Sequence, residues 1–361
     1  MYPLLGDVMN MEKEHNCDKS FYDKNGKCIF FSTDDFISKI VEKDNCFLCG
    51  VERRENTFND EHILPNWILK KFQLHQKSIT LPNLSQFRYD QYKIPCCIDC
   101  NSFLGKTVES YFSNLIRGGH EAIANSIIEG KSLNIFIWLA LIFVKTHLKD
   151  RILRFYKDQR LGENKISELY EWKNIHHIYS VARAVYSDAI FDNNVQGSIL
   201  ILPAIVSPEE EAFDFSDNYE ACSLYIKMDD FAIISVFNDS SACMQFITPI
   251  LDQIKGPLNT LQLREVFAHM CFINNNLEER PKYCSLHNKE TDEYMISCNL
   301  PKNPPRLKKF KKSEWGEYLY DFIPNKDSIK IMNKGKALNL EDIKNGNLTF
   351  LTDEDGNFIN N

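Results

Sequence analysis

Three short stretches of the chain decide how its first third folds: CFLC at residues 46–49, DEHILP at 60–65 and CIDCN at 97–101. In each CxxC pair, the two intervening residues let both thiolates reach one ion from a tight turn. Two such pairs make the tetrahedral set of a structural zinc site, here Cys46, Cys49, Cys97 and Cys100. Because four thiolates leave no open position for water, this zinc is expected to stabilise the fold and not to catalyse.

The composition is that of an ordinary globular protein. Of the 361 residues, 43% are hydrophobic and 25% are charged, which excludes wholesale disorder, a collagen-like fibre and a coiled-coil rod. The net charge of −8 excludes a highly basic nucleic-acid coat, although one face can still be basic. No basic region followed by an apolar one opens the sequence, so we expect no signal peptide, a cytoplasmic location and reduced cysteines.

The sequence predicts an α+β fold in three parts: an N-terminal segment over 1–40, a zinc-knuckle module over 41–118 and a larger α+β domain over 119–361. The longest apolar run, 135–144, is too short to span a bilayer, so we predict a buried helix closed by Lys145 and no membrane contact. The last part is expected to contain strands near 198–206, 222–228 and 231–237 and a helix near 263–270.

Two blocks of charge stand out in the C-terminal part. Residues 208–220 carry six acids and no base, and a solvated loop is predicted there. Residues 301–312 carry six bases and no acid. For this basic block two interpretations stay open, a solvated loop and a surface that contacts a phosphate backbone.

Glu61 and His62 lie between the two knuckles and are the residues best suited to chemistry. A carboxylate can hold a hard divalent cation, and an imidazole can take a proton near pH 7. Adjacent residues of a strand point to opposite faces, so the pair serves one site only if the backbone bends or the substrate fits between them. Pro65 and the turn residues around it favour such a bend.

The order CxxC, acid-His-Ile-x-Pro, CxxC-Asn resembles the HNH endonuclease family, whose fold is the ββα-metal module, over Cys46 to about Glu109. The resemblance implies that His62 is the general base that activates water against a phosphodiester. It implies that Glu61 and Asn101 hold a catalytic Mg²⁺ or Mn²⁺ and that the four cysteines hold the zinc of the family's zinc-stabilised members. The implied substrate is nucleic acid, with DNA expected before RNA.

Three positions depart from the family's pattern. Tyr92 stands where a middle Asn is usual, with Gln91 or the more distant Asn83 as a substitute, and Leu104 stands where a lysine is common. The acid before the histidine is Glu61 with Asp60 adjacent, so the sequence leaves open which carboxylate binds metal.

The sequence therefore predicts a metal-dependent endonuclease whose added C-terminal domain selects the substrate, binds a regulatory protein or holds the nuclease inactive. Many bacterial proteins of this family with large extra domains act in antiviral defence, and the resemblance extends that expectation here. The alternative is a zinc-knuckle module that binds nucleic acid or protein without cleavage. Zinc-dependent hydrolysis of a small molecule is disfavoured, because it needs an open zinc coordination position.

Overall fold

The computed structural model describes residues 4–5, 13–15, 19–323, 332–333, 336–337 and 340–360, with side chains described in 19–323 and 340–360. It confirms the predicted α+β class. The chain forms two compact units. The first comprises Met1–Gly118, Asn125–Gln196 and Lys282–Asn299, and the second comprises Gly119–Ala124, Gly197–Pro281 and Leu300–Asn361.

The first unit combines short strands with helices. Its strands are β1 (Leu4–Leu5), β2 (Lys13–His15), β3 (Phe21–Tyr22), β4 (Cys28–Phe30), β5 (Glu61–His62), β6 (Ser78–Thr80), β7 (Gln86–Arg88), β8 (Lys93–Ile94), β9 (Ile190–Asp192), β14 (Lys282–Asn288) and β15 (Glu293–Asn299). Its helices are α1 (Thr33–Asp35), α2 (Asn66–Lys71), α3 (Ile98–Leu104), α4 (Ser110–Ile116), α6 (Ser132–Asp150), α7 (His176–Ala182) and α8 (Ala184–Ser187), with π-helical turns at Phe36–Val41 and Gly105–Glu109. Helix α5 (Gly119–Ile128) begins in the second unit and ends in the first.

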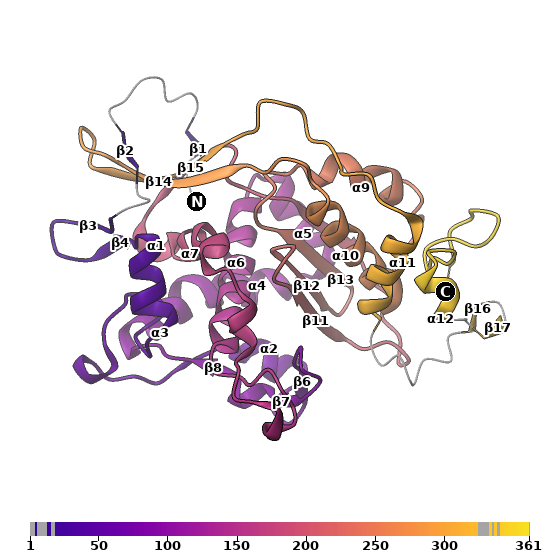
Figure 1. Ribbon diagram of the computed structural model, residues 1–361, viewed down its shortest axis with the longest axis horizontal. Helices are drawn as coiled ribbons and strands as arrows, with labels where there is room; N and C mark the ends of the chain where they lie inside the picture. The colour runs from indigo at the N-terminus through magenta and orange to yellow at the C-terminus, as the bar shows by residue number, and fades with distance from the viewer. Residues whose placement is uncertain are drawn as a thin grey trace. The chain divides into compact units, whose positions relative to one another are not determined.

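Helix α6 is the core of the first unit, as the apolar run predicted (Figure 1). Its residues 135–145 are all buried, and the Trp138 ring stacks on Phe112 of α4 with centroids 4.7 Å apart. Within the described part of the chain, α6 is the one helix long and apolar enough to cross a membrane. Nearly nine-tenths (89%) of its apolar window is buried in the protein, as in the core helix of a soluble protein.

Arg183 fixes the first cysteine knuckle to the N-terminal hairpin. Its guanidinium is 1% exposed and donates to the carbonyl oxygens of Leu48 at 2.6 Å, Ile29 at 3.0 Å and Cys28 at 2.8 Å. A buried cation needs several acceptors to offset its loss of hydration, and three carbonyls supply them. This contact joins β4, the knuckle loop and the end of α7 into one body.

The second unit packs helices against an antiparallel sheet of order β10-β13-β12-β11. Its elements are β10 (Ile199–Pro203), β11 (Phe213–Asn218), β12 (Ser223–Met228), β13 (Phe231–Val236), α9 (Cys243–Leu251), α10 (Thr260–Asn275), α11 (Lys312–Asp321), β16 (Met332–Asn333), β17 (Lys336–Ala337) and α12 (Leu340–Lys344). Strands β12 and β13 are buried throughout, and Leu263, Val266 and Phe267 of α10 join their core, so the predicted strands and helix are confirmed.

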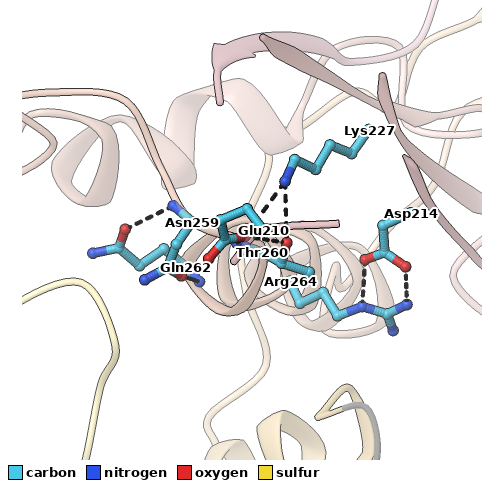
Figure 2. Close-up of polar contacts among 7 residues, drawn as sticks. All are labelled: Glu210, Asp214, Lys227, Asn259, Thr260, Gln262 and Arg264. Atoms are coloured by element: carbon cyan, nitrogen blue, oxygen red, sulfur yellow. Dashed lines mark hydrogen bonds and ion pairs between the residues drawn. The ribbon is translucent and has the colours of Figure 1, made fainter. Parts of the chain in front are cut away.

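The predicted solvated loop at 208–220 is wrong over its second half, where residues 213–218 form β11, and two of its six acids are paired with bases (Figure 2). Asp214 of β11 makes a two-pronged contact with Arg264 of α10, at 2.7 and 2.6 Å. Glu210 accepts from Thr260 at the start of α10 and lies 3.4 Å from the fully buried ammonium of Lys227. A helix N-terminus attracts a carboxylate, and a buried lysine requires one, so these two acids have structural partners.

The compact units divide the chain differently from the predicted parts 1–40, 41–118 and 119–361. Residues 125–196 belong with the knuckle module and not with the C-terminal domain. The physical reason is that α6 supplies the module with its apolar core and, as described below, with a buried lysine.

Candidate metal centre and the adjoining acid–histidine site

The four predicted cysteines lie together. The sulfur atoms of Cys46, Cys49, Cys97 and Cys100 all lie within 4.8 Å of one another, and the Sγ atoms of Cys49 and Cys97 are 3.8 Å apart. Three of these residues are buried and Cys49 is half-buried. Four thiolates at this spacing form a ligand set that could hold a metal ion such as zinc.

Local backbone structure explains why the sulfurs converge. In the first knuckle the Gly50 amide bonds to the Cys46 carbonyl at 2.8 Å, and Gly50 adopts a left-handed φ of +81° that closes the turn. A Cβ at Gly50 would lie 2.6 Å from the Phe31 ring, so the turn also needs a residue without a side chain. In the second knuckle Cys97 is the N-cap of α3 and Cys100 lies in its first turn.

Hydrogen bonds among three of the four thiols, those of Cys46, Cys49 and Cys100, shift their pKa values. Hydrogen bonds from Cys100 and Cys49 lower the pKa of Cys46, and the same contact with Cys46 raises the pKa of Cys100. Without a cation, one ionised thiol therefore opposes ionisation of its neighbours. Cys96 is fully buried against Cys46 and lies outside the four-sulfur cluster, as its spacing predicted.

Glu61 and His62 lie on an antiparallel ribbon between the knuckles. Strand β5 pairs with β8 so that Glu61 faces Ile94 and His62 faces Lys93. The same register continues outward to an isolated bridge between Phe58 and Cys97, so the ribbon leads directly into the second knuckle and α3. The paired strands β5 and β8 are thus followed by helix α3. Cys97 and Cys100 of the cysteine cluster lie where β8 leads into α3.

A backbone bend precedes the acid–histidine pair. Asp60 adopts a left-handed φ of +49°, which is unusual for a residue other than glycine. Its side chain pairs with Arg53 at the surface, and its carbonyl oxygen accepts from the Asn101 amide at 3.0 Å. The bend predicted around Pro65 is present as well, because the backbone bends at Ile63 and Leu64.

Glu61 belongs to a buried charge cluster with two residues that the sequence did not single out. Lys145 of α6 is 1% exposed and donates to the Glu61 carboxylate at 2.8 Å and to the His62 carbonyl at 2.7 Å. Burial and the charge of Glu61, to which it is hydrogen-bonded, raise the pKa of Glu109 to about 7. Two carboxyl groups and one ammonium thus meet beside the histidine.

His62 is half-buried and neutral at physiological pH. Burial is the main cause that lowers its pKa to about 4, and the charges of Lys93 and Lys145 lower it further. The nearby charge of Glu61 acts in the opposite direction but does not prevail. A neutral imidazole can accept a proton, so His62 is in the protonation state that a general base requires.

The other predicted site residues have specific contacts. Asp60 is engaged with Arg53, whereas Glu61 lies beside a second carboxyl group, so Glu61 is the better placed of the two for a cation. Asn101 ties α3 to the strand that carries Glu61, and its role as a metal ligand stays a prediction. Asn83 donates to the Arg154 carbonyl at 2.7 Å and does not substitute for the missing middle Asn.

Lys145 and Glu109 escaped the sequence analysis because nothing local marks them. Lys145 follows an apolar run and looks like the solvated end of a helix. Glu109 precedes a helix at a position where an acid is ordinary. One signal was available: the run before Lys145 is apolar on every face of the predicted helix, so a lysine that continues this helix is surrounded by core residues.

An open basic groove with a volume of about 500 Å³ lies between α2 and α4. Its lining residues are Trp67, Lys70, Lys71, Ser113, Ile116 and Arg117, with no acid among them. Helix α2 begins shortly after His62, and α4 begins directly after Glu109. The groove is therefore lined by residues of the two helices that follow His62 and Glu109 along the chain.

The chain matches no protein-family model, and no curated protein or solved structure is significantly similar to it.

Zinc should be present in the purified protein and should require the four-cysteine cluster. Cys49→Ser removes one of the four ligands at a half-buried position, and we expect the bound zinc to be lost and the protein to melt at a lower temperature, because metal binding contributes on the order of 10 kcal/mol to such folds. Metal content by mass spectrometry and thermal unfolding measure both effects. Cys284→Ser, also half-buried, and Cys96→Ala should both keep the metal. Zinc retained in Cys49→Ser would contradict the assignment.

Removing one partner of the Lys145–Glu61 ion pair should lower the free energy of unfolding more than replacing both partners. Lys145→Met leaves a buried carboxylate without its cation, and we expect the free energy of unfolding to fall by about 3–5 kcal/mol. In the double variant Lys145→Met/Glu61→Gln most of that loss should be recovered. Urea unfolding measures each step, with the exposed Lys106→Met as control. A double variant as unstable as the sum of the two single ones would argue against direct coupling.

Proposed function

We propose that this protein is a metal-dependent endonuclease of the HNH type that hydrolyses phosphodiester bonds in nucleic acid, with DNA as the expected substrate. The observation that carries the proposal is the contact between the Glu61 and Glu109 carboxyl groups beside His62, on a ribbon that ends in the four-cysteine cluster. A protein that only binds a partner has no need for two carboxyl groups in contact, one buried and one half-buried, next to a half-buried histidine.

The donor set suits a hard divalent cation. Two carboxyl groups in contact repel each other when both ionise, and Mg²⁺ or Mn²⁺ prefers oxygen ligands of this kind. Glu61 and Glu109 would hold the ion, with Asn101 as the further ligand that the family pattern implies. Such an ion stabilises negative charge on the scissile phosphate and on the departing oxygen.

The chain's own residues then have separate tasks. His62, neutral because it is buried among cations, takes the proton from the attacking water. Lys145 holds the Glu61 carboxylate and the His62 backbone in place from the core helix. The four cysteines and Arg183 keep the two ends of the ribbon at a fixed separation. The α2–α4 groove, with three bases and no acid, suits the phosphates that flank the scissile bond.

A cytoplasmic location stays an expectation from the sequence, and a role in antiviral defence rests on the family pattern alone. A binding module without catalysis is the second candidate. It is favoured by the engagement of Glu61 with Lys145 and of Asn101 with the Asp60 carbonyl, since both contacts give these residues a structural task.

His62→Ala should abolish cleavage without unfolding the protein. We expect the nicking of supercoiled plasmid in Mg²⁺ or Mn²⁺ to fall by about 10²–10⁴-fold, the usual contribution of a general base, and to vanish in EDTA for both proteins. His120→Ala, a change at a partly exposed histidine of the second unit, serves as the matched control and should keep full activity. Nicking that survives in His62→Ala would place the activity elsewhere, and an inactive wild-type protein would favour the binding module.

Glu109→Gln should weaken binding of the catalytic metal more than it lowers the stability of the protein. The amide keeps the size of the side chain but removes the second negative charge, so the Mn²⁺ concentration for half-maximal nicking should rise about tenfold or more. A titration of nicking rate against Mn²⁺ measures this shift. Glu129→Gln, at an exposed acid paired with Lys131, should leave the curve unchanged. An unshifted curve for Glu109→Gln would remove Glu109 from the metal site.

A further inference from the structure

The basic block forms a surface strap that crosses the second unit. We call the segment 301–312 the basic strap; its six cations are Lys302, Arg306, Lys308, Lys309, Lys311 and Lys312. Its backbone is fixed by two hydrogen bonds around an isolated bridge between Leu307 and Leu277. The Glu278 amide donates to the Arg306 carbonyl at 2.9 Å, and the Lys308 amide donates to the Asn276 carbonyl at 2.8 Å. The strap is therefore not a free loop.

This anchoring determines which side chains face the solvent. Side chains alternate between the two faces of an extended segment. Leu307 packs against the apolar core of the second unit, and its neighbours Arg306 and Lys308 are exposed. Lys309 and Lys311 are exposed as well, although alternation would place them on the same face as Leu307, so the alternating pattern ends at Lys308. The bridge at Leu307 thus holds Arg306 and Lys308 outward, and the two lysines that follow add to the exposed charge.

The cations of the strap differ from the buried bases of the same unit. Lys227 and Arg264 are each paired with a carboxylate of the acidic block. Among the described residues, no carboxylate lies within ion-pair distance of any of the six cations of the strap. The Lys312 ammonium contacts only the Asn347 amide oxygen, at 3.1 Å. Two carboxylates contact the strap at other groups: Glu279 accepts from the Asn303 side chain at 3.1 Å, and Glu314 accepts from the Lys311 backbone amide at 3.2 Å. Cationic groups without ion-pair partners, held close together, repel one another and favour a polyanionic partner.

An exposed aromatic ring lies among these charges. Phe310, between Lys309 and Lys311, is 46% exposed although its ring packs edge-on against Phe272, with centroids 4.8 Å apart. One side of the ring is thus fixed by the core while much of the rest meets water. Cations that follow a backbone together with an aromatic platform are the combination that binds single-stranded nucleic acid, because bases stack on the ring and phosphates pair with the cations.

We propose that the basic strap is a nucleic-acid binding surface, with Arg306, Lys308, Lys309 and Lys311 contacting phosphates and Phe310 stacking on a base of a single-stranded segment. This assigns the second unit a task in substrate binding. It draws on the proposed function only for the class of ligand, because its evidence comes from other residues. An acidic protein could meet the cations but gives Phe310 no base to stack on, so nucleic acid is the partner that the strap fits better.

The test uses the full chain with His62→Ala, so that bound nucleic acid is not cut. Fluorescence anisotropy with a labelled oligothymidine strand, measured over a range of salt concentrations, gives both the affinity and its salt dependence. In the variant Arg306→Gln/Lys308→Gln/Lys309→Gln/Lys311→Gln, affinity should fall at least about tenfold, and the slope of log K against log salt should shrink by about 0.7 for each lost phosphate contact. Phe310→Ala should lower affinity about fivefold or more without changing that slope.

The matched control changes four exposed lysines of the first unit, Lys24, Lys43, Lys157 and Lys173, to glutamine and so removes the same net charge. The proposal requires this control to bind almost as well as the parent. Equal losses in the strap variant and the control would reduce the effect to net charge and overturn it. Loss of salt dependence with no effect of Phe310→Ala would also overturn it, because the strap would then attract any polyanion.

The strap and the nuclease can fail separately. If the wild-type protein binds nucleic acid through the strap but never cuts plasmid, the proposal for the strap holds and the proposal of a nuclease fails. Plasmid nicking that depends on His62, together with strap variants that bind like the control, would do the reverse.

Discussion

The buried ammonium of Lys145 is the contact on which the candidate site depends. It comes from the middle of the core helix and reaches both the Glu61 carboxylate and the His62 carbonyl. A lysine with 1% exposure is tolerated only where acceptors surround it, so the core of the first unit and its acid–histidine ribbon have to fold together. This is why residues 125–196 cannot be separated from the knuckle module.

A second constraint holds the other side of the ribbon. The cysteine cluster joins the turn at 46–49 to the start of α3, and Arg183 attaches that turn to β4. The Glu61 side chain is thus held by Lys145 of the core helix, and His62 is held by the pairing of β5 with β8. Asp60, in the left-handed conformation, directly precedes the pair. The arrangement keeps two carboxyl groups close together at a cost in charge repulsion that a divalent cation would relieve.

Sequence reasoning succeeded where the chemistry is local. The spacing within each CxxC pair fixes how two sulfurs can meet, and the apolar runs within 222–228 and 231–237 are typical of strands that are buried in a sheet. It could not place Lys145 or Glu109, because their importance comes only from contacts across 84 and 48 residues with Glu61. A residue type that is ordinary in its own segment gives no sign of a distant partner.

The two charge blocks also show that a local pattern does not reveal its partners. Residues 208–220 carry six acids and no base, and residues 301–312 carry six bases and no acid. In the folded chain Glu210 and Asp214 meet buried bases, whereas the cations of the basic strap meet no acid among the described residues. A charge block therefore indicates a binding surface only when folding leaves it uncompensated. By that criterion Glu210 and Asp214 of the acidic block stabilise the fold of the second unit, and the basic strap is the part of that unit that still requires a partner.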